Sequence, residues 1–187
     1  MVMKGRFKVN TKKLLLVGGL LLLMSITSVG VVQAAGLTQD EEYWLTYMRE
    51  EEKLARDVYI FMYDKWGSQI FSNISVSEQT HMDAIKTLLD RYGIPDPAAG
   101  KGPGVFTNQD LQDLYNTLIE DGSVSLVEAL RVGMVIEETD IDDLNAGIAS
   151  TKRKDIKTVY SNLLRGSLNH LKAFVSNLAL QGIVYEP

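Results

Sequence analysis

The sequence predicts an all-α protein in which four long helices form a bundle, with one long connection between the second and the third. Three observations predict this class. From residue 38 onward, apolar residues recur at intervals of three and four, and alternation with a period of two is scarce. Residues that start and stop helices divide this region into four long segments and a short one. A chain of 187 residues is long enough for one domain with a complete core.

The chain is expected to divide into an N-terminal segment, residues 1–35, and one helical domain, residues 36–187. Five basic residues and no acidic residue precede a leucine-rich run at residues 14–24, and small residues follow it up to residue 35. This order is typical of a secretory signal peptide. The uncharged stretch 14–32 also approaches the length of about 20 residues that a membrane span needs, so an uncleaved anchor is the alternative. In both cases we expect the domain to be exported: periplasmic, extracellular or anchored to the outer face of the cytoplasmic membrane.

The composition excludes several kinds of site. Because the chain has no cysteine, it has no disulfide, thiolate metal site or cysteine nucleophile, and its two histidines are too few for a three-histidine zinc site. The net charge is −5 although the N-terminal segment is basic, so the helical domain is strongly acidic. We therefore expect metal ions as partners, no nucleic acid, and membrane contact only through the N-terminal segment. The sequence leaves open whether the protein forms an oligomer.

Capping signals delimit the first two long helices. Residues 38–41 (TQDE) form a capping box, which predicts a helix start, and Gly67 is expected to end this helix. The second helix is expected to begin near residue 72 or 73 and to end at residues 93–95 (GIP).

A loop and a short helix are expected to join the two halves of the bundle. Residues 93–106 contain three of the four prolines and four glycines, which predicts a loop, and a short helix follows up to residue 122. A second capping box at residues 125–128 opens the third long helix, which runs to about residue 149. The fourth follows the basic turn 152–154 and ends near Gly182.

Each long helix has an apolar stripe that is interrupted by polar residues near its middle. A buried and unpaired carboxylate costs several kcal/mol, so carboxylates and imidazoles at one level of a bundle need a common compensation, which a divalent cation provides. Oxygen and imidazole ligands suit iron or manganese, and also zinc. The polar residues are Glu52 in the first helix, Glu78 and His81 in the second, Glu137 in the third, and Ser167 and His170 in the fourth.

Simpler interpretations of these residues stay open. Glu78 can be the second half of a capping box with Ser75 at a helix start. Acidic runs such as residues 50–52 usually face solvent, and a shift of one residue would turn Glu51 inward instead of its neighbour. Tyr59 and Tyr160 can be ordinary core aromatics. Taken together, however, both histidines fall on predicted inner faces, one in each half of the bundle, which favours a metal site.

Five segments of the sequence also resemble a known family. Residues 48–59, 71–97, 104–115, 132–144 and 163–174 resemble the uncharacterised ferritin-like family catalogued as domain of unknown function 2202, and the resemblance spans residues 38–182. More loosely, Glu52-x-x-Ala55-Arg56-x-x-Tyr59 is similar to the first helix of rubrerythrins. The resemblance implies a ferritin-like four-helix bundle with a long crossover and a carboxylate-bridged metal site, and it implies no particular reaction.

The ferritin-like pattern requires a glutamate from two helices and Glu-x-x-His from the other two. Glu52 fits the first position, Glu78-x-x-His81 the second and Glu137 the third. Glu138 takes the place of Glu137 if the phase of the third helix is shifted by one residue. The fourth departs from the pattern, because Ser167 stands where a glutamate is expected. Three carboxylates would then have to balance the four positive charges of two divalent ions. Either Asp140 or an external anion makes up the difference, or the second metal binds weakly.

These residues predict an exported protein that binds one or two non-haem iron ions, with manganese or zinc as alternatives. We expect oxidase- or peroxidase-type redox activity with dioxygen or peroxide, and Tyr59 and Tyr160 are candidate redox or hydrogen-bonding neighbours of the metal. The alternative is a non-catalytic exported bundle with a structural metal or none, which binds a component of the cell envelope.

Overall fold

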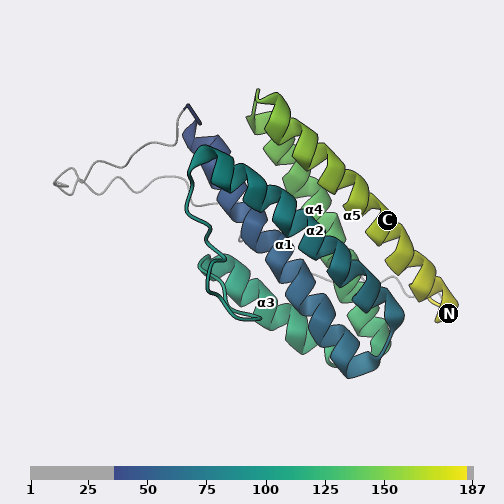
Figure 1. Cartoon of the computed structure of the whole chain (residues 1–187). Helices are drawn as coiled ribbons and strands as arrows, with labels where there is room; N and C mark the ends of the chain where they lie inside the picture. The colour runs from purple at the N-terminus through teal and green to yellow at the C-terminus, as the bar shows by residue number, and fades with distance from the viewer. Residues whose placement is uncertain (1–35, 185–187) are drawn as a thin grey trace, which may run out of the picture. The chain divides into compact units, whose positions relative to one another are not determined.

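The structure is a computed structural model that describes residues 36–184, and within this range it contains five α-helices and no strand (Figure 1). The predicted all-α class is confirmed. The expected export segment, residues 1–35, lies outside the described residues. Within residues 36–184, no helix combines the length and the apolar composition that crossing a bilayer requires. The helices are α1 (Gln39–Trp66), α2 (Gln69–Tyr92), α3 (Gln109–Gly122), α4 (Leu126–Ser150) and α5 (Lys154–Leu180).

The four longer helices pack side by side as two hairpins, α1 with α2 and α4 with α5 (Figure 1). Further contacts join α1 to α4 and α2 to α5, so all four helices contribute to one interior. The shorter α3 packs against α1 and α4 from outside this arrangement. Residues 93–125, which include α3, connect α2 to α4.

The interior consists of two apolar clusters at different levels of the helices. One cluster is built around Tyr59, Phe71 and Phe174, and the other around Leu45 and Ile85. On each long helix the residues between the two clusters include a buried polar side chain. A polar layer therefore lies between two apolar layers, as the interrupted stripes of the sequence predict.

The capping signals that the sequence shows clearly are confirmed. The hydroxyl of Thr38 accepts a hydrogen bond from the Glu41 amide at 3.2 Å, and Oε2 of Glu41 accepts one from the Thr38 amide at 2.9 Å. Gly67 ends α1 at a φ of 64°, a left-handed conformation that glycine adopts readily. The Ser125 hydroxyl accepts a hydrogen bond from the Glu128 amide and opens α4. The Glu128 carboxylate lies 3.3 Å from Arg131, so only the first half of this predicted capping box is confirmed.

The predicted start of α2 is wrong. The helix begins at Gln69, before the expected residue 72 or 73, and its N-cap residue Ser68 makes no side-chain capping hydrogen bond. The chain therefore enters α2 without the local signal on which the prediction depended. Glu78 lies well inside this helix, which excludes its role in a capping box with Ser75, and the hydroxyl of Ser75 donates to the Ser72 carbonyl instead.

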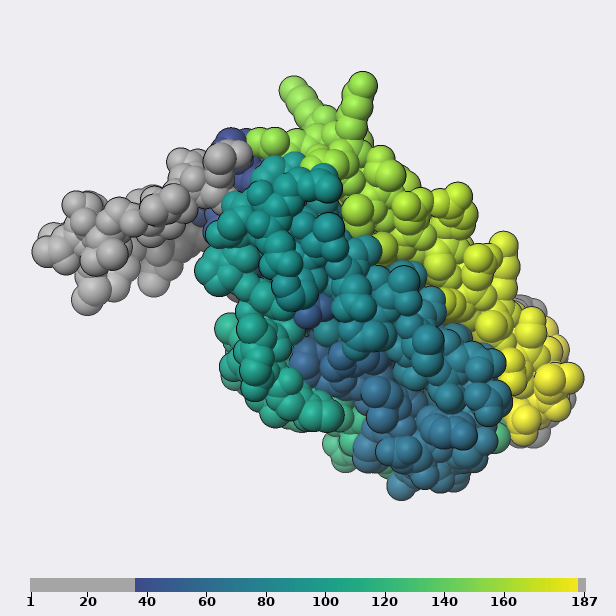
Figure 2. Space-filling view, in the orientation of Figure 1, coloured from purple at the N-terminus to yellow at the C-terminus, as the bar shows by residue number. Residues whose placement is uncertain are grey.

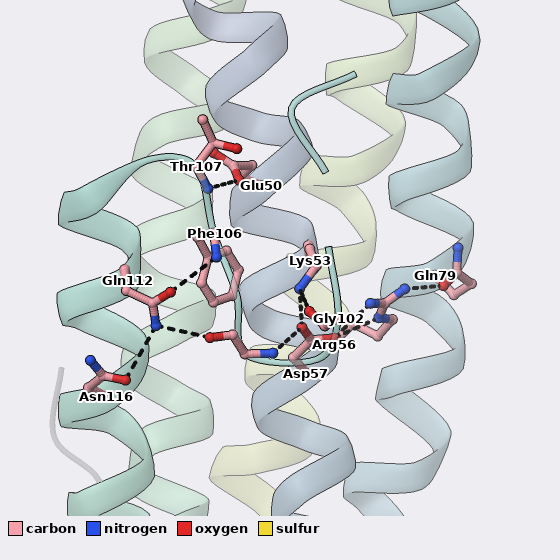
Figure 3. Close-up of polar contacts among 11 residues, drawn as sticks. Glu50, Lys53, Arg56, Asp57, Gln79, Gly102, Phe106, Thr107, Gln112 and Asn116 are labelled. Carbon is pink, nitrogen blue, oxygen red and sulfur yellow. Dashed lines mark hydrogen bonds and ion pairs between the residues drawn. The ribbon is translucent and has the colours of Figure 1, made fainter. Parts of the chain in front are cut away.

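The loop predicted at residues 93–106 is present and extends to residue 108. Charged side chains bind it to α1 (Figure 3). Lys53 donates to the Asp57 carboxylate at 2.5 Å and to the Gly102 carbonyl at 2.8 Å. Glu50 accepts hydrogen bonds from the backbone amides of Thr107 and Asn108, directly before α3. In Figure 2 α1 is visible only in part between α2 and this region of the chain. The alternative interpretation that the acidic run at residues 50–52 faces solvent is therefore wrong, because all three of its side chains are buried.

Candidate metal centre

Five of the predicted ligands meet in the polar layer. They form two groups, and in each group three ligand atoms lie within 4.8 Å of one another. Glu78 belongs to both groups because its two oxygens face different histidines: Oε2 lies 2.8 Å from Nδ1 of His81, and Oε1 lies 2.8 Å from Nδ1 of His170. One carboxylate thus stands between two sets of donors. The first group is Glu52, Glu78 and His81, and the second is Glu78, Glu137 and His170.

Each histidine also approaches a second carboxylate. Nδ1 of His81 lies 3.2 Å from Oε2 of Glu52, and Nδ1 of His170 lies 3.4 Å from Oε2 of Glu137. The two imidazole rings stack at a centroid distance of 5.6 Å. The other ring nitrogen of His170 lies 2.9 Å from the hydroxyl of Ser77, a contact that fixes the orientation of the ring. Nδ1 of each histidine faces two carboxylates.

Strong electrostatic coupling accompanies this packing. Burial lowers the pKa of His81, but hydrogen bonds with Glu52 and Glu78 outweigh burial and raise it to about 11. Burial also lowers the pKa of His170, but the nearby carboxylates of Glu137 and Glu78 outweigh burial and raise it to about 9. Burial raises the pKa of Glu78, and the two histidines close to it outweigh burial and lower its pKa to about 2. Without a metal, the two imidazoles therefore carry the protons that neutralise Glu78.

Two imidazolium charges do not neutralise the whole layer. Burial raises the pKa of Glu137 to about 7 and that of Asp140 to about 8, and nearby carboxylates add to both shifts. Burial and the charge of Asp140 raise the pKa of Glu52 well above its usual range. The layer therefore holds more carboxylate groups than the side chains around it can compensate.

Several polar atoms in the layer are buried without a hydrogen-bond partner among the described residues. They include Oε1 of Glu52 and Oδ1 of Asp140. Oε1 of Glu78 and Nδ1 of His170 are also among them, because they approach to 2.8 Å without the geometry of a hydrogen bond. Unpaired donor atoms of this kind are costly in a protein interior. Carboxylate oxygens and imidazole nitrogens at these distances fit a divalent iron, manganese or zinc ion.

The other predicted residues are distributed unevenly around the two groups. The hydroxyl of Tyr59 donates to Oε1 of Glu137 at 2.6 Å, inside the polar layer. Tyr160 instead packs in the apolar cluster around Leu45, and its hydroxyl has no hydrogen-bond partner in the described part of the chain. Glu138, the substitute for Glu137, is half-buried and belongs to neither group. Ser167 is fully buried, and its hydroxyl donates to the carboxylate of Asp140.

Sequence analysis missed two features of the layer. The first is the pair Glu51 and Asp143, where burial and then the charge of Asp140 raise the pKa of Glu51 well above its usual range. The spacing of Asp140 and Asp143 on one helix face is the signal that could have indicated it. The second is Gly166 on α5, where a Cβ atom would lie 2.6 Å from Nε2 of His81. A glycine inside a long helix was its signal in the sequence.

Comparison with known proteins places the chain in a family. The family described as "Uncharacterized protein domain (DUF2202)" matches residues 41–187. The chain is 52% identical over 151 residues to "Uncharacterized protein MJ0754" of Methanocaldococcus jannaschii, a match that covers 81% of this chain and 82% of that protein. The crystal structure of hypothetical protein MJ0754 superposes with a TM-score of 0.80 at 52% identity and covers 81% of this chain and 87% of that one. The chain therefore belongs to the DUF2202 family.

Proposed function

We propose that this protein is an exported ferritin-like metal-binding protein that holds non-haem iron and reacts with dioxygen or peroxide. The observation that carries the proposal is the position of Glu78, whose two oxygens each lie 2.8 Å from a different histidine. A carboxylate between two donor groups is the arrangement that a two-ion centre uses. Manganese and zinc are the other metals that this donor set accepts.

The proposal includes the finer architecture. The four long helices correspond to a ferritin-like bundle, and residues 93–125 correspond to its long crossover. Support comes from the pairwise packing of α1, α2, α4 and α5, and from ligand groups that draw on all four. Export rests on the composition of residues 1–35, and the mass of the product secreted by a bacterial host tests it.

The chain's own side chains have distinct roles in this proposal. Glu52 and His81 would hold one ion, Glu137 and His170 the other, and Glu78 would contact both. A redox-active ion supplies electrons to dioxygen or peroxide when it is bound. The apolar clusters on either side of the layer keep bulk water from the ligands, which strengthens every charge interaction there.

Tyr59 would position one ligand of the second ion. Its hydroxyl donates to Oε1 of Glu137, so Oε2 of the same carboxylate remains directed toward His170. Such hydrogen bonds from neighbouring side chains orient metal ligands and tune their basicity.

Anaerobic reconstitution of the helical domain with ferrous iron tests the proposal. We expect up to two iron ions per chain, and their oxidation on addition of peroxide or dioxygen, followed by visible absorption and electron paramagnetic resonance. Glu78→Ala should lose most of the bound iron, whereas Glu120→Ala, at an exposed position on α3, should bind like the wild type. Absence of bound iron in the wild type, together with unchanged stability in Glu78→Ala, would overturn the proposal.

One observation favours a second function. Ser167 stands where the ferritin-like pattern has a glutamate, which weakens the analogy with redox-active centres. The second candidate is a non-catalytic exported bundle that binds an envelope component and carries a structural metal or none. Iron that binds but keeps its oxidation state under excess peroxide would support this candidate.

A further inference from the structure

Helix α5 approaches the first ligand group closely at Gly166. At Gly166 a Cβ atom would lie 2.6 Å from Nε2 and 2.7 Å from Cε1 of His81. The next residue, Ser167, is fully buried and has a short side chain. Gly166 therefore leaves room for the ring of His81, and the short side chain of Ser167 leaves room for a side chain from another helix.

Asp140 of α4 fills the space in front of Ser167. Its carboxylate accepts a hydrogen bond through Oδ2 from the Ser167 hydroxyl, which has the Leu163 carbonyl, 3.0 Å away, as its other acceptor. Oδ1 has no hydrogen-bond partner among residues 36–184, although Asp140 is only 5% exposed. One oxygen is thus held by a neutral donor, and the other is buried without compensation.

Asp140 belongs to neither ligand group, but its carboxylate acts electrostatically on both. It interacts with Glu137 of the second group, with the shared Glu78 and with His81 of the first. Besides burial, the charge of Asp140 also raises the pKa of Glu52 in the first group. Asp140 also follows Glu137 by three residues on α4, so the two side chains share one face of the helix.

We propose that Asp140 is the fourth carboxylate ligand of the metal centre, supplied by α4 in place of a glutamate from α5 and oriented by the hydroxyl of Ser167. The inference rests on the proposed two-ion centre. Four carboxylates match the four charges of two divalent ions, with both imidazoles neutral. The hydroxyl of Ser167 occupies one oxygen of Asp140 and leaves the other for a metal, which is how neighbouring donors commonly fix carboxylate ligands.

Titration of the helical domain with cobalt(II) tests the inference, with bound metal counted after gel filtration and its coordination followed by visible absorption. We expect two cobalt ions per wild-type chain. Asp140→Asn preserves the shape of the side chain and should keep one ion while weakening the second at least tenfold. Asp142→Asn, at an exposed position on the same helix, should bind both ions like the wild type.

The outcomes distinguish this inference from the proposed function. Two ions bound equally well by wild type and Asp140→Asn would overturn the inference and leave the two-ion centre intact. No cobalt bound by the wild type would overturn both. Thermal unfolding of each metal-free variant shows whether a loss of cobalt binding is due to misfolding.

An exchange of the two side chains gives a second test that does not depend on Asp140→Asn. Asp140→Ser should lose the second ion, and the double variant Asp140→Ser/Ser167→Glu should regain it to within a few-fold of the wild type, because it moves the carboxylate to α5. Equal binding by Asp140→Ser and wild type would overturn the inference. Failure of the double variant to regain the ion would overturn the claim that positions 140 and 167 serve one ligand site.

Discussion

The hydroxyl of Tyr59 donates a hydrogen bond of 2.6 Å to Oε1 of Glu137, and both side chains are buried. Tyr59→Phe removes this donor and leaves the ring in place. Hydrogen bonds to charged groups contribute about 1.5–3 kcal/mol, so we expect a loss of this order in the free energy of unfolding of the metal-free protein, measured in urea. Metal affinity should fall about 10- to 100-fold, the usual effect of losing such a supporting contact.

Tyr160→Phe is the matched control for this variant. Tyr160 is equally buried, but its hydroxyl has no hydrogen-bond partner in the described range and packs away from both ligand groups. Tyr160→Phe should therefore bind metal like the wild type. Equal metal affinities in both tyrosine variants would contradict a supporting role for Tyr59.

Metal binding should release protons. Because the pKa of His81 is raised to about 11 and that of His170 to about 9, both imidazoles are protonated at neutral pH in the metal-free protein. A metal binds only the neutral imidazole, so each ion must displace protons, and affinity should rise as pH increases from 6 to 9. Calorimetric titration in buffers of different ionisation enthalpy measures the released protons. An affinity that is independent of pH would argue against histidine ligation.

Gly166→Ala should disturb the first ligand group selectively. The added methyl group would contact the imidazole of His81, so the ring must move away from Glu52 and Glu78. We expect a loss of at least tenfold in affinity for one of the two ions, although alanine is favoured over glycine in a helix by about 1 kcal/mol. Cobalt titration measures the affinity. Asn169→Ala, at an exposed position on the same helix, is the control and should change neither binding nor stability appreciably.

The buried ion pair of Lys53 and Asp57 should contribute strongly to stability. Both side chains are nearly inaccessible to solvent, and Asp57 also accepts from the backbone amide of Gly104, which ties the 93–108 loop to α1. Asp57→Asn leaves the ammonium group of Lys53 without its ionic partner, and breaking a buried pair in this way typically costs about 3–5 kcal/mol. Urea denaturation measures the change in the free energy of unfolding.

The pair Lys86 and Asp90 provides the comparison on the surface. It has the same spacing on a helix, but its side chains are 45% and 63% exposed. Asp90→Asn should change the free energy of unfolding by less than about 1 kcal/mol. If Asp57→Asn and Asp90→Asn lower the free energy of unfolding equally, the buried ion pair contributes no more to stability than the exposed one.

Much of the fold could be predicted because the relevant signals are local. The capping residues at Thr38 and Ser125 and the glycine at position 67 act within one helical turn, and the structure has each of them in the expected role. The stripe pattern also placed Glu52 and Glu137 on buried faces, since burial of a helix follows its periodicity.

The remaining features depend on contacts between distant parts of the chain. Glu50 and Glu51 are buried because the segment containing α3 folds back over α1, and no pattern within the acidic run indicates that cover. The start of α2 was missed because Ser68 provides no side-chain cap. Asp140 and Ser167 are 27 residues apart, and their pairing follows only from the packing of α4 against α5.

The most direct test of the central claim is an anomalous-scattering map of crystals grown with cobalt(II). The shared position of Glu78 predicts two strong peaks about 3.5–4 Å apart, one beside His81 and one beside His170, with a Glu78 oxygen directed at each. A single ion on the protein surface, or a map with no peak beside either histidine, would contradict the account.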